Sequence, residues 1–180
     1  MQIRTQLALL VLVALGWGAG SAVAVRPVVD DRPLARANLR VLEERLARDP
    51  SDVITARELS ERYRRLGMNQ LVADTIARCN TNVQTDAQIA LCAGRAQLAL
   101  GNLRAAAAQV DGALIRCQGF TGELAVAVGC GVHTQTELAI ESSVIDRLIQ
   151  WNVDPRRDPD RVELARSLAL RPTHFAHIGP

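Results

Sequence analysis

Apolar side chains recur every three or four residues along most of this chain. That spacing places them on one face of an α-helix. Three stretches show it clearly, at Leu34, Val41, Leu42 and Leu46, at Leu103, Ala106, Val110 and Leu114, and at Leu138, Val144, Ile145 and Leu148. No stretch shows the strict alternation of a β-strand, so the pattern predicts an all-α fold.

Capping and helix-breaking residues set the expected boundaries. Asp or Asn precedes the predicted starts, and Gly or Asp-Pro follows several predicted ends. We expect about seven main helices, a short helix from Thr121, and a polar loop over Asn80–Thr85. The main helices are predicted at 31–49, 52–66, 69–79, 86–101, 102–118, 136–151 and 158–169. Residues 171–180 are expected to form a flexible tail.

Composition supports close-packed helices, and the charges of the chain are nearly balanced. Aromatic residues make up 3% of the chain, and all 21 basic residues are arginine. Without Arg4, in the predicted export signal, twenty arginines face 19 acidic residues. This balance gives no electrostatic reason to expect binding to nucleic acid or to a membrane surface.

The first 24 residues have the pattern of an export signal. Arg4 is followed by an unbroken apolar run over 7–15, and Ala22-Val23-Ala24 supplies the small residues that a signal peptidase accepts. We therefore expect cleavage after Ala24, a periplasmic location, and one mature domain over residues 25–170. The alternative is an uncleaved segment that anchors the chain in the inner membrane.

Four cysteines fall into two equally spaced pairs. Cys79 and Cys92 are separated by the same interval as Cys117 and Cys130. In an exported protein this favours two disulfides, Cys79–Cys92 and Cys117–Cys130. The other two connectivities and free buried thiols are the alternatives. The chain has no Cys-x-x-Cys motif for zinc or thiol exchange.

Two stretches within Asp52–Gln118 resemble the tetratricopeptide repeat, because they share small and apolar residues at its 34-residue period. The first copy has Ala56, Leu59, Ser60, Tyr63, Gly67, Val72, Ile76 and Cys79, and the second has Ala90, Ala93, Gly94, Gln97, Gly101, Ala106, Val110 and Ala113. Tyr63 matches the family pattern, whereas Gln97 does not, and alanine replaces the large first residue in both copies. The resemblance implies a right-handed stack of α/α hairpins, a solenoid stapled here by disulfides.

The resemblance also implies a groove that binds a partner protein. In this family the first helix of each hairpin lines the groove. The matching positions are Ile54, Arg57, Glu61, Arg64, Gln88, Leu91 and Arg95. Because guanidinium groups bind carboxylates in pairs of hydrogen bonds, the arginines favour an acidic segment or a C-terminus. The alternative is that they are ordinary surface arginines neutralised by neighbouring acids.

No constellation of residues indicates catalysis, a metal or a cofactor. A Cys130–His133 nucleophile pair would lose its thiol to the predicted disulfide, and His174 and His177 lie in the predicted tail. We therefore expect an adaptor or assembly factor rather than an enzyme. The main alternative is a structural subunit of a periplasmic or cell-surface complex. The partner and the oligomeric state do not follow from the sequence.

Overall fold

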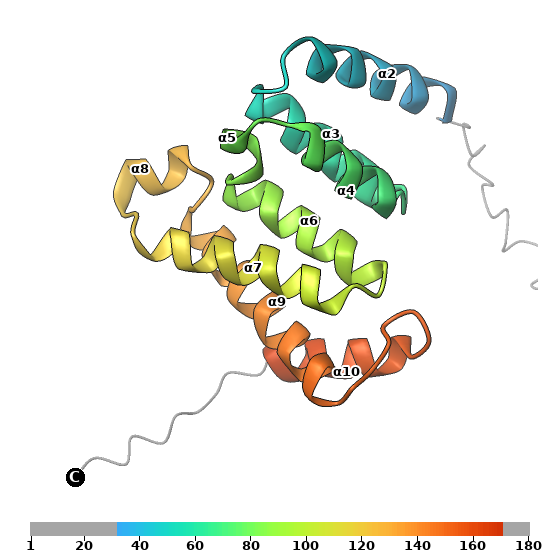
Figure 1. Cartoon of the computed structure of the whole chain (residues 1–180), viewed down its shortest axis with the longest axis vertical. Coiled ribbons are helices and arrows are strands. Elements are labelled where there is room, and N and C mark those ends of the chain that lie inside the picture. The colour runs from blue at the N-terminus through green and yellow to red at the C-terminus, as the bar shows by residue number, and fades with distance from the viewer. Residues whose placement is uncertain (1–31, 171–180) are drawn as a thin grey trace, which may run out of the picture. The chain divides into compact units, whose positions relative to one another are not determined.

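The structure is a computed structural model that describes residues 32–170, and this part of the chain is helical throughout (Figure 1). Its nine helices are α2 (Arg32–Arg48), α3 (Val53–Arg65), α4 (Asn69–Arg78), α5 (Thr81–Gln84), α6 (Ala87–Ala99), α7 (Leu103–Gln118), α8 (Gly122–Ala127), α9 (Val132–Gln150) and α10 (Pro159–Leu170). The all-α prediction is confirmed. The predicted signal peptide and tail lie outside the described residues.

The predicted caps begin two of the central helices. The Asp52 carboxylate accepts a hydrogen bond from the Thr55 backbone N–H at 3.0 Å, and Asp86 accepts one from Ile89 at 3.1 Å. Gly67 and Gly101 follow the same two helices with φ of 72° and 80°. This left-handed backbone ends a helix cleanly and favours glycine.

The seven main helices and the short helix expected from Thr121 are present in the described residues, and α5 is an additional one. The predicted loop over Asn80–Thr85 contains the single helical turn α5, which the fully buried Val83 anchors to the core. Helix α9 begins at Val132, four residues before its predicted start at 136. A single apolar residue in a polar run is too weak a periodic signal to reveal a short helix.

Three helix pairs follow one another along the chain, namely α3 with α4, α6 with α7, and α9 with α10. The first helices of these pairs also meet, because α6 contacts both α3 and α9. Gly94 on α6 faces α7 so closely that a Cβ there would collide with the Val110 side chain. Ser60, Ala106 and Ala113 are fully buried. Small residues therefore lie where the sequence predicts close helix packing.

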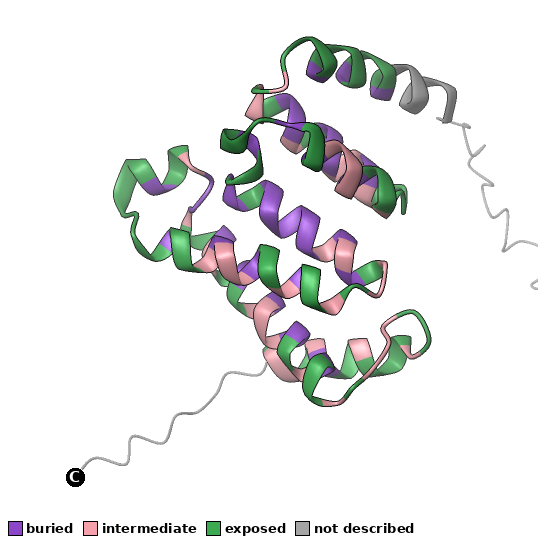
Figure 2. Cartoon of the chain, in the orientation of Figure 1, coloured by how far each residue is buried: buried purple, intermediate pink, exposed green. Residues whose placement is uncertain are grey.

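Two groups of buried side chains meet at α6, which is buried along much of its length (Figure 2). Ile89 and Cys92 belong to the core formed with α2, α3, α4 and α5. Ala90 and Leu91 belong to the core formed with α7, α8, α9 and α10. Helix α6 therefore connects the two halves, and its polar residues Gln88 and Arg95 occupy the surface that remains open.

Candidate functional site: a groove across α3, α6 and α9

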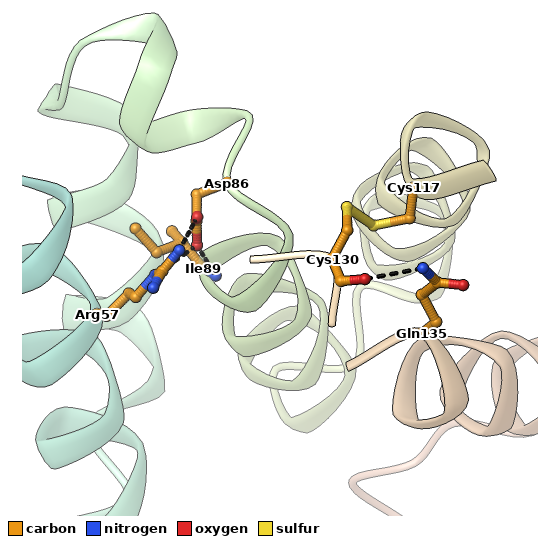
Figure 3. The surroundings of a disulfide bond; sticks show 6 residues. All are labelled: Arg57, Asp86, Ile89, Cys117, Cys130 and Gln135. Carbon is orange, nitrogen blue, oxygen red and sulfur yellow. Dashed lines mark hydrogen bonds and ion pairs between the residues drawn. A yellow bond between two sulfur atoms is a disulfide. The ribbon is translucent and has the colours of Figure 1, made fainter. Parts of the chain in front are cut away.

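The predicted disulfide between Cys117 and Cys130 is present (Figure 3). It joins the end of α7 to the loop before α9, and its Cα atoms are 5.3 Å apart, within the usual range for a bridge. The Gln135 side chain donates a hydrogen bond to the Cys130 carbonyl at 2.8 Å. The bridge therefore fixes the start of α9, which borders the groove.

The predicted Cys79–Cys92 bridge is wrong, because both residues are free buried thiols in the structure. The Cys79 thiol donates to the Thr75 carbonyl at 3.3 Å and lines a cavity beside Leu46. Cys92 lies inside α6 and lines the groove beside Glu61. Equal spacing misled the prediction, since Cys130 lies in a loop before its helix whereas Cys92 lies within one.

Six of the seven positions predicted to border the groove line one cavity of about 410 Å³, which we call the α3–α6–α9 groove. Helix α3 contributes Arg57, Glu61, Arg64 and Arg65, α6 contributes Gln88, Ile89, Leu91, Cys92 and Arg95, and α9 contributes His133, Thr134 and Glu137. Ile54 is 73% exposed and is not among the lining residues. The groove is thus built from the first helix of each pair.

Arg57 lines the groove and also holds two helices together. Its guanidinium donates two hydrogen bonds to the carboxylate of Asp86, one of them from Nε at 2.9 Å (Figure 3). The Asp86 side chain is only 3% exposed and also caps α6. Arg57 therefore connects α3 to α6 through this ion pair, and its side chain also borders the groove.

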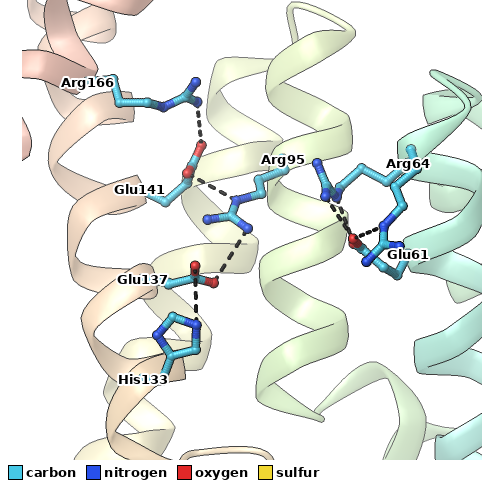
Figure 4. A network of polar contacts seen from close by, with 8 residues as sticks. Glu61, Arg64, Arg95, His133, Glu137, Glu141 and Arg166 are labelled. Carbon is cyan, nitrogen blue, oxygen red and sulfur yellow. Dashed lines mark hydrogen bonds and ion pairs between the residues drawn. The ribbon is translucent and has the colours of Figure 1, made fainter. Parts of the chain in front are cut away.

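Glu61 has two arginine partners on α3 (Figure 4). Arg64 donates to both carboxylate oxygens at 2.8 Å, and Arg65 adds a hydrogen bond at 2.8 Å. The hydrogen bonds from Arg64 are the main reason that the pKa of Glu61 falls to about 2. Glu61 therefore stays ionised over the physiological range.

Arg95 connects α6 to a buried carboxylate on α9 (Figure 4). Its Nε donates to Glu141 at 3.2 Å, and its Nη1 lies 3.5 Å from Glu137. Glu141 is also 3.6 Å from Arg166 of α10, whereas the exposed His133 lies 3.6 Å from Glu137. This chain of charges links α6, α9 and α10 along one side of the groove.

Sequence reasoning missed the contributions of α9 and α10, because the resemblance stops at Gln118. One signal was present, since Glu141 falls at helical spacing within the apolar stripe formed by Leu138, Ile145 and Leu148. A carboxylate in a buried stripe needs charged partners. Arg95 and Arg166 meet this need in the structure.

Cys92 is the only cysteine that lines the groove. Burial raises the pKa of its thiol to about 11. Because the thiolate is the reactive form, Cys92 has the properties of a packing residue rather than of a nucleophile. In the described part of the chain, no three His, Cys, Asp or Glu side chains cluster closely enough to hold a metal ion.

Comparison with protein-family models, with curated proteins and with solved structures finds no match to this chain. Among the described helices, none is both long and apolar enough to cross a membrane.

Proposed function

We propose that this protein is a periplasmic adaptor or assembly factor that holds a segment of a partner protein in the α3–α6–α9 groove. The observation that carries the proposal is the convergence of six predicted residues on one groove. The resemblance to the tetratricopeptide repeat implies these positions on α3 and α6. A third helix, α9, borders the same groove.

The repeat architecture is part of this proposal. A tetratricopeptide-like stack requires successive helix pairs whose first helices lie side by side. The pairs α3/α4, α6/α7 and α9/α10, together with the contacts of α6 to α3 and α9, support that arrangement. In such a stack, the first helices form the surface that receives an extended segment.

The groove favours a segment that supplies hydrogen-bond acceptors. Arg57, Arg64 and Arg95 each have a carboxylate partner within the chain, which reduces the gain expected from an acidic segment by charge alone. A guanidinium has five N–H donors, and these internal pairs occupy only some of them. We therefore propose that backbone carbonyls or carboxylates of the segment bind the remaining donors.

The disulfide supports an oxidising location, because such bridges persist mainly outside the cytoplasm. We propose export to the periplasm with cleavage after Ala24. Intact-mass measurement of the exported protein tests this step. A mature chain that begins at Val25 supports it, and retention of Met1 would favour an anchored form.

Filling the groove tests the binding proposal. Gln88 is exposed on α6 within the groove, and Gln109 is exposed on α7, which contributes no groove residue. Gln88→Trp should abolish capture of the native partner from periplasmic extract, whereas Gln109→Trp should leave capture unchanged. Equal capture by both variants would rule out the groove as the binding site.

A structural subunit is a second candidate, supported by exposed apolar side chains near the disulfide. The stretch Leu138–Trp151 does not provide the apolar face expected of such a subunit, because its main apolar residues are buried. Exposed apolar residues occur instead on the loop closed by the disulfide and beside it, at Ile115, Leu124, Val126 and Val132. A permanent complex that resists high salt and covers these residues would favour this candidate over a transient adaptor.

A further inference from the structure

A second hollow lies beside the groove, between α6, α9 and α10, and we call it the α10 hollow. Its volume is about 600 Å³, and it shares Arg64 and Arg95 with the α3–α6–α9 groove. Leu98, Val162 and Pro159 form part of its apolar wall. A segment that occupies the groove could therefore place one side chain in this hollow.

The α10 hollow contains a buried acceptor without a hydrogen bond. The Glu141 side chain is only 2% exposed, and its Oε1 atom has no hydrogen-bond partner within the described residues. The Nη2 atom of Arg166 stands 3.6 Å away, beyond hydrogen-bonding distance. A buried carboxylate oxygen in this state costs free energy unless a donor reaches it.

The arginines around the hollow already have acidic partners. Arg64 binds Glu61, and Arg95 binds both Glu137 and Glu141. The second carboxylate of the hollow, Glu163, has no ion pair among the described residues, and it is exposed at the rim. Among the described residues, the acceptors of the hollow that lack a hydrogen bond are thus Oε1 of Glu141 and the carboxylate of Glu163, and the arginine that lacks one is Arg166.

We propose that the α10 hollow binds a primary ammonium group carried on an apolar stem, supplied by a lysine side chain of the bound segment. The stem packs against Leu98 and Val162, and the ammonium donates to Oε1 of Glu141 and to Glu163. Lysine combines a four-carbon stem with three rotatable donors, which suits this wall and these acceptors. The proposal rests on the segment binding proposed above.

The partner must provide this ammonium, because the chain itself contains no lysine. Arg166 is the side chain that has to move aside, since its Nη2 atom lies 3.6 Å from Oε1 and its side chain is 40% exposed. It competes with the incoming ammonium for Glu141. Removing its charge should therefore strengthen binding of an amine, whereas it would weaken binding of an anion.

The test uses the chain with its disulfide intact and three small probes followed by amide NMR shifts. N-acetyl-lysine methylamide carries the side-chain ammonium, norleucine methylamide carries only an α-ammonium, and N-acetyl-norleucine methylamide carries no charge. The lysine probe should shift the amides of Leu98, Val162 and Glu163 saturably and bind about tenfold tighter than the uncharged probe. Equal shifts by both norleucine probes would show that an α-ammonium is not the group that binds in the hollow.

Two variants decide whether the acids are the acceptors. Glu163→Gln should weaken the lysine probe about fivefold, and Arg166→Gln should strengthen it about fivefold, the scale of one partly exposed ion pair. Arg104→Gln, which changes an exposed residue of α7 that lines neither the hollow nor the groove, should leave binding of the lysine probe unchanged. Three results would overturn the proposal. The lysine probe could bind Arg166→Gln more weakly than wild type, or it could bind no tighter than the uncharged probe. The third result is the lack of a saturable shift in both wild type and Arg166→Gln.

Failure of this inference can be told apart from failure of the proposed function. If the probes do not bind while Gln88→Trp still blocks partner capture, the groove remains the partner-binding site and the lysine site is rejected. If Gln88→Trp captures the partner normally, the groove is rejected as the partner-binding site, whether or not the probes bind.

Discussion

Arg57 of α3 and Asp86 at the start of α6 form a paired hydrogen bond, with Nε and Oδ1 2.9 Å apart. The same Asp86 carboxylate caps α6 by accepting the Ile89 N–H. One buried acid thus starts the central helix and ties it to α3. The backbone at Gly129 packs directly against this pair. The pair therefore sets the spacing of two helices that line the groove.

Replacing Asp86 should be costly, because it removes a helix cap and leaves a partly buried guanidinium without its partner. We expect Asp86→Ala to lower the free energy of unfolding by about 3 kcal/mol in urea titrations. Asp52→Ala is the matched control, since Asp52 caps α3 but pairs with the largely exposed Arg45. It should cost about 1 kcal/mol. Equal losses would show that the buried pair adds nothing beyond the cap.

Gly129 should tolerate alanine poorly. Its φ is +75°, and a Cβ atom there would lie 2.8 Å from Oδ2 of Asp86. Gly122 has a similar φ of +61° but no atom within 4 Å of the added Cβ. Both alanine variants carry backbone strain of about 1 kcal/mol, so any difference reports the contact with the pair. We expect Gly129→Ala to be less stable than Gly122→Ala by about 1 kcal/mol or more. The same stability for both would contradict close packing at Gly129.

Only one disulfide is expected in the purified protein. Non-reducing peptide mapping should find Cys117–Cys130, and Cys79 and Cys92 should alkylate only after unfolding. Burial raises the pKa of both thiols and shields them, so the folded protein should resist alkylation. A mapped Cys79–Cys92 linkage would contradict the structure.

Loss of that bridge should destabilise the fold. The double variant Cys117→Ala, Cys130→Ala should lower the free energy of unfolding by about 3 kcal/mol, the value expected for a loop of this length. Cys92→Ala is the control, because it removes a thiol that forms no bridge. A reducing agent should lower the stability of wild type but not that of the double variant.

Glu61 should contribute to stability in a defined acid range. Arg64 lowers its pKa to about 2, against about 4.3 in an unfolded chain. Protonation therefore favours unfolding, and the contribution of Glu61 is present above about pH 4.3 and lost as the pH falls toward 2. Because the side chain is 38% exposed, we expect less than about 1 kcal/mol. Glu61→Gln should flatten the stability profile between these pH values. An unchanged profile would show that the pair with Arg64 is not formed in solution.

The helical fold could be predicted because it depends on local signals, namely capping by Asp52 and Asp86, the breaks at Gly67 and Gly101, and the helical period. The groove residues of α3 and α6 were predicted from the resemblance to a repeat family. The roles of the arginines could not be predicted in the same way. Arg57 pairs with Asp86, which lies 29 residues later in the sequence, and Arg95 pairs with Glu141, which lies 46 residues later. Such partners depend on how helices pack, which periodicity does not encode.

The cysteines show the same limit. Matched spacing along the chain suggested two equivalent bridges, yet only Cys117 and Cys130 come together. Helix α5 and the Asp86 cap lie between Cys79 and the start of α6. Cys92 therefore lies within this central helix and not in a loop. The thiols then line different cavities. Spacing restricts which bridges are possible, and local helix boundaries decide which one forms.

Site-specific photo-crosslinking tests the central claim, that the α3–α6–α9 groove binds a partner protein, most directly. A benzophenone amino acid is placed at His133, an exposed residue that lines the groove, or at Gln109 on α7, and cells producing the full chain are irradiated. We predict a discrete adduct from position 133 with a single partner protein, lost when a second change, Gln88→Trp, fills the groove. Position 109 should give no such adduct. An adduct from position 109 alone, or equal adducts from both positions, would contradict the groove as the binding site.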